Sequence, residues 1–355
     1  MDLLYLILSK LSIPDLFRCA AVCSRWFVLV DEVCRSHDDQ HPQIPWLVPE
    51  SRIHINGENN VRNTYDFFSL SEDREYDIPS HPPHILKKIV GSSYGWLITT
   101  DKVSIAQLIN PITGVQIDLP SIPTMHNWNL EARKAVLSSD PSRCGDYKVV
   151  FVFFCLHELK NFLFFVSAGD EKWTMIPERL YYYANIAFHD GKLYAVSKSK
   201  ENKKLIVGAY DLSVPNSIPT RVRVADLPYI KNFTFSMCFF CTSSDDLLIV
   251  RATIEKVSEH HLKKIKVWKV DTNNGVIIPM NNLGKYALFI GLTSSLCLDT
   301  SSLPDLKSNS IYILNYLGES VVYNMEDKSF TSLNLPLLSS PMRPVLVWFT
   351  LSCAF

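Results

Sequence analysis

The sequence predicts a mainly β protein that begins with a short helical segment. Three features lead to this prediction. In roughly the first 35 residues, apolar side chains recur at helical spacing. From about residue 50 onward, short runs rich in Val, Ile, Phe, Tyr and Thr alternate with turn residues. Pairs of these runs then recur along the remaining chain, so a small α-helical part precedes a much larger β part.

Length and charge exclude several classes of protein. The chain has 355 residues, of which 47% are hydrophobic and 20% charged, so it can bury a sizeable core. Its formal net charge of -1 does not favour binding to nucleic acid or to an anionic membrane surface. The longest apolar run, Val149 to Leu156, is far shorter than the roughly 20 residues of a transmembrane helix. We therefore expect neither a nucleic-acid nor a membrane partner.

The cysteines indicate a reducing compartment. There are nine, an odd number, and they have no regular spacing, which favours the cytoplasm or the nucleus. Cys238 and Cys241 have the spacing of zinc ligands, but in a strand positions i and i+3 point to opposite faces, and no second pair follows. We expect these two side chains to pack in the core and the protein to need no metal and no cofactor.

The N-terminal segment has the pattern of two or three short helices. Leu4, Ile7, Leu8 and Leu11 form one apolar stripe. The segment from Ser12 to Asp15 has the form of a capping box, in which Pro14 occupies a position that needs no amide hydrogen, so a second helix starts here. Because so small a unit cannot bury its apolar faces alone, it must dock on the rest of the chain or on another protein.

The order and spacing of these residues resemble the F-box, a helical module that binds the Skp-type adaptor of cullin ubiquitin ligases. The matching positions are Leu3-Leu4, Ile7 to Leu11, Asp15-Leu16, Arg18, Val22-Cys23 and Trp26. The resemblance implies a Skp-type adaptor and, through it, a cullin as partners. It also implies that the adaptor contacts are Leu8, Leu11, Pro14, Leu16 and Trp26.

One departure from the F-box pattern bears on adaptor binding. The family usually has a Leu-Pro pair before the first helix, whereas this sequence starts at Met1-Asp2, inside that helix. Either the sequence is truncated or adaptor binding is weakened. An ordinary helical hairpin packed on the following domain is the alternative interpretation of this segment.

The chain divides into three parts. Residues 1–40 form the N-terminally incomplete F-box-like module, and residues 41–50 form a stiff linker marked by Pro42, Pro45 and Pro49. Residues 51–355 form the β domain. In it, a strand, a polar turn, a second strand and a proline recur, and a further strand precedes most of these units. The hairpins start near Tyr65, Ile105, Phe162, Leu205, Ile265 and Val321.

This period of about 40 to 60 residues is in the range of propeller blades. We count six blades. The last run, Val345 to Phe349, would pair with an early blade and close the ring. A pair of stacked β-sandwiches is the alternative, although sandwiches show turn signals at closer spacing. Trp96, Trp173 and Trp348 are expected to fill the wedges between blades.

The β domain is similar to the KIB-type β-propeller domain that follows the F-box in a large plant family. The similar segments include Gly95-Trp96-Leu97, Asn110-Pro111, Ala135 to Pro141, Gly169 to Thr174, Gly191 to Val196, Leu283-Gly284 and Trp348-Phe349-Thr350. The resemblance implies a propeller that recruits a client protein to a Skp-cullin-F-box (SCF) ubiquitin ligase. It does not identify the client or the face that binds it.

We expect no catalytic residues. The sequence has no G-x-S-x-G elbow and no glycine-rich phosphate loop, and His157-Glu158 lacks the second histidine of a zinc-protease motif. Two alternatives to the substrate receptor remain. One is an interaction scaffold that has lost adaptor binding, and the less favoured one is a propeller hydrolase.

Overall fold

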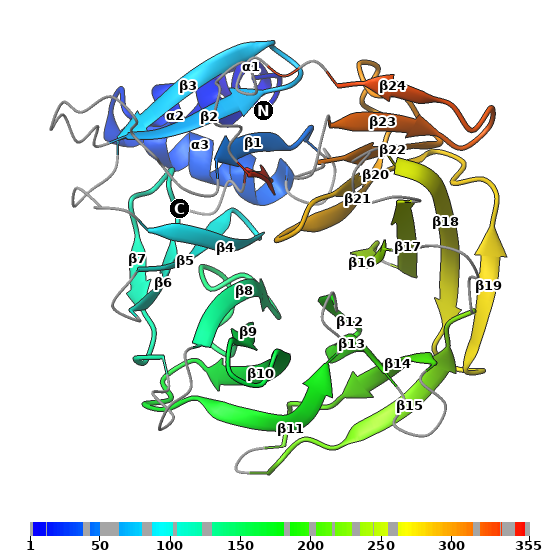
Figure 1. The fold of residues 1–355 in the computed structure, drawn as a ribbon. Helices are drawn as coiled ribbons and strands as arrows, with labels where there is room; N and C mark the ends of the chain where they lie inside the picture. Colours follow the sequence, from blue (N-terminus) through cyan, green and yellow to red (C-terminus); the bar gives the residue numbers. More distant parts are fainter. Residues whose placement is uncertain are drawn as a thin grey trace, which may run out of the picture.

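A computed structural model gives the fold of most of the chain. It describes residues 3–11, 13–37, 43–49, 64–79, 87–101, 105–122, 130–180, 185–198, 204–214, 217–228, 235–243, 245–254, 262–314, 320–333, 335 and 345–351. Figure 1 shows a ring of β-sheets with the helices against one side of it. The mainly β class is therefore confirmed.

Three helices form the N-terminal part, which we call the helical module: α1 (Leu3–Leu8), α2 (Ile13–Ala20) and α3 (Ser24–His37). The predicted restart of the chain near residue 12 is confirmed, since α2 begins at Ile13. Asp15 lies in the first turn of α2, where a carboxylate is favourable for the helix dipole. The Arg18 guanidinium lies 2.5 Å from its carboxylate one turn later.

The first three blades of the propeller follow the helices. Blade 1 contains the last strand of the chain as its innermost strand. The strands are β25 (Leu346–Phe349), β1 (Trp46–Pro49), β2 (Thr64–Ser69) and β3 (Arg74–Pro79) in blade 1; β4 (Lys88–Ser93), β5 (Trp96–Thr100), β6 (Ala106–Ile109) and β7 (Gln116–Asp118) in blade 2; and β8 (Leu130–Leu137), β9 (Lys148–Cys155), β10 (Lys160–Ser167) and β11 (Thr174–Leu180) in blade 3.

Three more blades complete the six predicted from the repeats. Blade 4 shares one residue pair, Leu180 with Ser197, with blade 3. The strands are β12 (Ile186–His189), β13 (Lys192–Lys198), β14 (Leu205–Tyr210) and β15 (Arg221–Asp226) in blade 4; β16 (Phe235–Thr242), β17 (Leu247–Ile254), β18 (Leu262–Asp271) and β19 (Val276–Met280) in blade 5; and β20 (Tyr286–Ile290), β21 (Ser295–Asp299), β22 (Ser310–Ile313), β23 (Val321–Asn324) and β24 (Phe330–Ser332) in blade 6.

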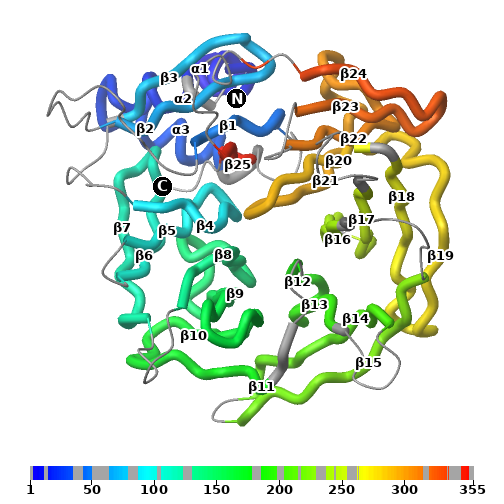
Figure 2. Tube along the Cα trace, in the orientation of Figure 1, coloured from blue at the N-terminus to red at the C-terminus, as the bar shows by residue number. Residues whose placement is uncertain are grey.

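The predicted closure of the ring by the last strand is confirmed. β25 pairs antiparallel with β1 in blade 1, from Trp46 opposite Phe349 to Pro49 opposite Leu346. We call this pair of strands the ring closure; Figure 2 shows β25 beside β1 and β4. The pairing gives β1 a hydrogen-bonded neighbour on its inner side and so leaves it no free edge there.

Three expectations need correction. The segment 41–50 contains β1, so Trp46 to Pro49 belongs to the first sheet and not to a linker. The sequence repeats identified the three outer strands of most blades but not the short innermost strands such as β12. Blade 6 has five strands, because the chain returns after β21 and places β22 parallel to β20.

The three tryptophans pack between blades as expected. The Trp96 indole of blade 2 donates to the Asp140 carboxylate of blade 3 at 3.1 Å. In the opposite direction, Trp173 of blade 3 donates to the Pro120 carbonyl at 2.8 Å. The Trp348 ring meets Phe289 of blade 6 edge to face at 5.0 Å. These large rings hold blade 2 against blade 3 and blade 1 against blade 6.

Candidate adaptor-binding surface

The helical module and the propeller are joined by one apolar core. Its buried members, which we call the shared core, come from all three helices and from blades 1 and 2. They are Leu8, Leu16, Val30, Val33, Cys34, Trp46, Val48, Phe67, Ile89, Leu97, Val347, Phe349 and Leu351. The module is therefore docked on its own propeller, and only its remaining surface is available to a partner.

A cation–π contact also joins the helical module to blade 1. The Arg18 guanidinium of α2 lies over the Tyr76 ring of β3, 5.8 Å from its centroid. That ring in turn stacks on Trp46 of β1 at 4.7 Å. The hydrogen bond to Asp15 raises the pKa of Arg18 above its usual value, so the guanidinium stays charged in this position.

The five predicted adaptor contacts differ in how far they are buried. Leu8 and Leu16 are 0% and 1% exposed and belong to the shared core, so in this structure they pack the helices on the propeller. Leu11 and Trp26 are half-buried against the same core. Pro14 belongs to α2, but its side chain lies outside the described residues.

The module nevertheless exposes large apolar side chains outside the shared core. We call them the exposed apolar set: Leu3, Leu6 and Ile7 of α1, Val22 before α3, and Phe27 and Val28 within α3. Their exposed fractions range from 42% for Phe27 to 71% for Leu3. Six exposed apolar side chains in so short a segment are typical of a surface that another protein covers.

The signal for this second surface is present in the sequence of α1. Its six residues, LLYLIL, are apolar all round, whereas a helix that covers only its own domain has one polar face. The predicted stripe of Leu4, Ile7, Leu8 and Leu11 is only partly buried, because Leu8 lies in the shared core while Ile7 is 51% exposed. The stripe alone does not predict that the buried side faces the chain's own propeller or that the opposite side is free for a partner.

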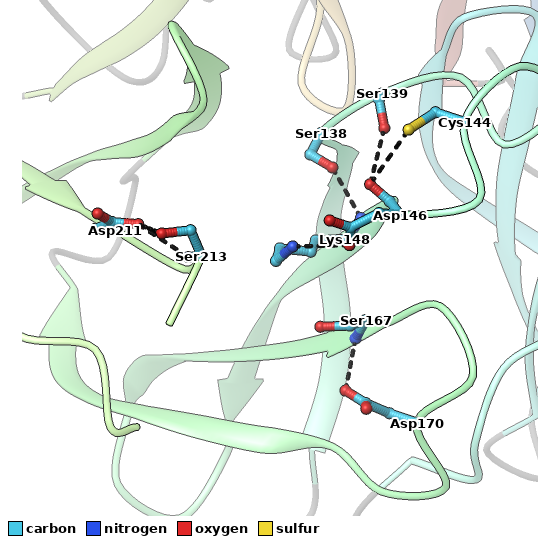
Figure 3. A network of polar contacts seen from close by, with 9 residues as sticks. All are labelled: Ser138, Ser139, Cys144, Asp146, Lys148, Ser167, Asp170, Asp211 and Ser213. Carbon is cyan, nitrogen blue, oxygen red and sulfur yellow. Dashed lines mark hydrogen bonds and ion pairs between the residues drawn. The ribbon is translucent and has the colours of Figure 1, made fainter. Parts of the chain in front are cut away.

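Polar side chains also gather in the loops at one end of blades 3 and 4 (Figure 3). The Lys148 ammonium lies 3.1 Å from the Asp146 carboxylate, and the Ser167 amide donates to Asp170 at 2.8 Å. Hydrogen bonds from Ser213 lower the pKa of Asp211, and the charge of Lys148 contributes. Most of these bonds are local turn contacts, so they order the loops of this face.

The two cysteines with zinc-ligand spacing point to opposite faces of β16, as expected. Cys238 packs between blades 4 and 5, whereas Cys241 packs between blades 5 and 6. Both side chains are buried, and burial raises the pKa of the Cys238 thiol to about 11. Because the two sulfurs lie on opposite faces of the strand, they cannot both bind the same metal ion.

This burial predicts a pattern of thiol reactivity. In the native protein at pH 8, iodoacetamide is expected to modify the exposed Cys23 and Cys144 at least about 100-fold faster than Cys238, because the thiolate is the reactive form. Mass spectrometry of labelled peptides over time measures both rates, and labelling in denaturant is the control. Equal native rates for Cys144 and Cys238 would contradict the burial of β16.

No helix in the described part of the chain is long and apolar enough to cross a membrane.

Comparison with known proteins identifies both parts of the chain. The KIB1-4 beta-propeller profile matches residues 67–326, and the F-box-like profile matches residues 1–37. The F-box protein At2g05970 of Arabidopsis thaliana is 26% identical over 341 residues, which cover 89% of this chain and 83% of that protein. The F-box/kelch-repeat protein KIB1 of the same plant is 24% identical, covering 92% of this chain and 80% of KIB1.

Solved structures are more distant. Regucalcin from Agrobacterium tumefaciens aligns with 82% of this chain and 83% of its own, at 13% identity and a TM-score of 0.38. A match at this level says nothing about the activity of the present chain.

Proposed function

Because this chain belongs to the KIB1-4 beta-propeller family and carries an F-box-like module, we propose that it is the substrate receptor of an SCF-type ubiquitin ligase. The helical module binds a Skp-type adaptor, and the propeller holds a client protein. At the level of the family, the combination of an F-box and a propeller indicates this role. The exposed apolar set of the module is the observation that carries the proposal for this chain.

The division of surfaces on the module supports adaptor binding. One side packs into the shared core, while Leu3, Ile7 and Val28 are each more than half exposed. Apolar contacts of this kind release water when a partner helix covers them, and this supplies much of the free energy of association. The partner must present a complementary apolar surface, as an amphipathic helix does.

The proposed role of the propeller requires no bond chemistry in this chain. A receptor speeds ubiquitination by raising the local concentration of its client beside the ligase. For this purpose the client-binding loops need a fixed position relative to the adaptor. The shared core supplies that position, because it packs the helices against blades 1 and 2.

Charge substitutions in the exposed apolar set test the proposal. Replacing Ile7 or Val28 by Glu is expected to weaken binding of a purified plant Skp-type adaptor at least about 30-fold, because a carboxylate would be buried in an apolar interface. Isothermal titration calorimetry measures the dissociation constants. The melting temperature should change little, since Ile7 and Val28 are 51% and 62% exposed.

A matched control separates surface chemistry from general damage. Val222 on β15 is 64% exposed and lies on the propeller, so Val222→Glu should leave adaptor affinity unchanged. The proposal fails if the wild-type chain does not bind the adaptor. It also fails if Ile7→Glu, Val28→Glu and Val222→Glu all bind as the wild type does.

A further inference from the structure

We propose that the helical module is a clamp on the ring closure, so that the helices that face a partner and the strands that close the propeller stabilise each other. An early and a late segment of the chain pair in blade 1, where β25 forms a ladder with β1 over four residues. This ladder is short, and the strands that form it lie at opposite ends of the sequence. Closure therefore depends on what covers the side chains of β25.

The two faces of β25 are covered by different parts of the molecule. Trp348 points toward blade 6, where it packs on Phe289 and its carbonyl accepts a hydrogen bond from the Ser294 hydroxyl at 2.9 Å. Val347 and Phe349 point the other way, into the shared core. The rings of Phe349 and Phe67 of β2 lie 5.0 Å apart there.

The helices contribute side chains to that same core. Five of the thirteen buried members of the shared core come from the module: Leu8, Leu16, Val30, Val33 and Cys34. Val30 and Val33 lie one turn apart on the same face of α3, and both are 0% exposed. Removing volume there leaves the β25 side of the same core with fewer contacts, because a packed core relaxes only partly around a cavity.

Two chains of contact link the module to the closure. One is the apolar core itself, and the other runs from Arg18 over Tyr76 to Trp46, the residue of β1 that lies opposite Phe349 in the ladder. Coupling between two elements is reciprocal. Loosening the helices should loosen the closure, and loosening the closure should loosen the helices.

Hydrogen exchange on the full chain tests the clamp without any partner. Val30→Ala is expected to speed exchange of the β25 and β1 amides at least 10-fold and to leave β17 unchanged. Val207→Ala is the matched control, because Val207 is equally buried but packs between blades 4 and 5. It should speed exchange in those blades and not in β25. Equal acceleration of β25 by both variants, or none by Val30→Ala, would overturn the proposal.

The reciprocal experiment starts from the closure. Phe349→Leu is expected to speed exchange of the α3 amides at least 5-fold, whereas Phe240→Leu, a similarly buried position in blade 5, should not. If neither variant alters α3, the coupling is absent. Both comparisons use the isolated chain, so their outcome does not depend on whether a Skp-type adaptor binds, and failure of the clamp can be told apart from failure of the proposed function.

Discussion

Lys134→Met is expected to raise the free energy of unfolding by several kcal/mol at pH 7, with a gain that shrinks as the pH approaches 10. Lys134 lies on β8, the innermost strand of blade 3, and is 5% exposed. Burial lowers the pKa of its ammonium from 10.5 to about 7. The neighbouring Cys241 thiol does not offset this, because burial raises the pKa of that thiol and keeps it uncharged near neutral pH. Among the described residues, no carboxylate forms an ion pair with it. Met has a similar length and no charge to bury.

The sign of the pH dependence follows from the two protonation equilibria. Below about pH 7 both the folded and the unfolded chain carry the proton, so the full cost of burying the charge is present, on the order of 5 kcal/mol. Between about pH 7 and 10.5 only the unfolded chain holds the proton, and the cost declines as the pH rises. Stability of the wild type therefore increases with pH across this window.

Urea unfolding of both proteins at several pH values between 6 and 10 measures the effect. The exposed Lys192 provides a control, because Lys192→Met should leave the pH dependence of stability unchanged. A difference between wild type and Lys134→Met that stays constant from pH 6 to 10 would show that Lys134 is not buried as a charge.

Gly91→Ala is expected to destabilise the fold by about 3 kcal/mol or more. Gly91 lies in β4 of blade 2, where its backbone approaches the inner strand of blade 3. A Cβ atom there would stand 2.2 Å from the Ala135 carbonyl oxygen, a distance that requires the two strands to move apart. The innermost strands are the narrowest part of the ring, so such a shift disturbs both blades.

The same measurement on Gly145→Ala provides the control. Gly145 lies in the loop between β8 and β9, and a Cβ atom there would meet nothing within 4 Å. Its substitution should change the free energy of unfolding by no more than about 0.5 kcal/mol. If the urea midpoints of the two alanine variants were alike, the close approach of β4 and β8 would be wrong.

The outer strands of the propeller were predictable because their sequences combine β-formers with turn residues. The turn at Asp190-Gly191, with φ of 46° and 69°, is an example, since both residue types tolerate positive φ. The inner strands gave weaker signals. β12 has four residues, and β21 is only partly buried along its whole length. β1 was missed because Pro45 precedes it and Pro49 is its last residue, and the two prolines indicated a linker.

The sequence predicted which segment carries the candidate site, but not which of its side chains are buried. Helical spacing correctly located the module and the burial of Leu8, but it placed Ile7, which is 51% exposed, on the same stripe. It could not show that this stripe packs on strands 40 to 340 residues away in the chain, because Trp46 and Phe349 are brought to it only by closure of the ring. In the structure Leu8 and Leu16 lie in the shared core, whereas Ile7 and Phe27 are exposed, and we propose that these exposed side chains contact the adaptor.

Photo-crosslinking from a single position tests directly whether the helical module contacts the adaptor. A photoreactive benzoylphenylalanine in place of Ile7, irradiated with a purified Skp-type adaptor, should yield a covalent one-to-one product, since Ile7 is half exposed on the module. The same probe at Val222 of the propeller should yield none. A product from Val222 alone, or from neither position, would contradict the claim that the helical module grips the adaptor with the side it turns away from its propeller.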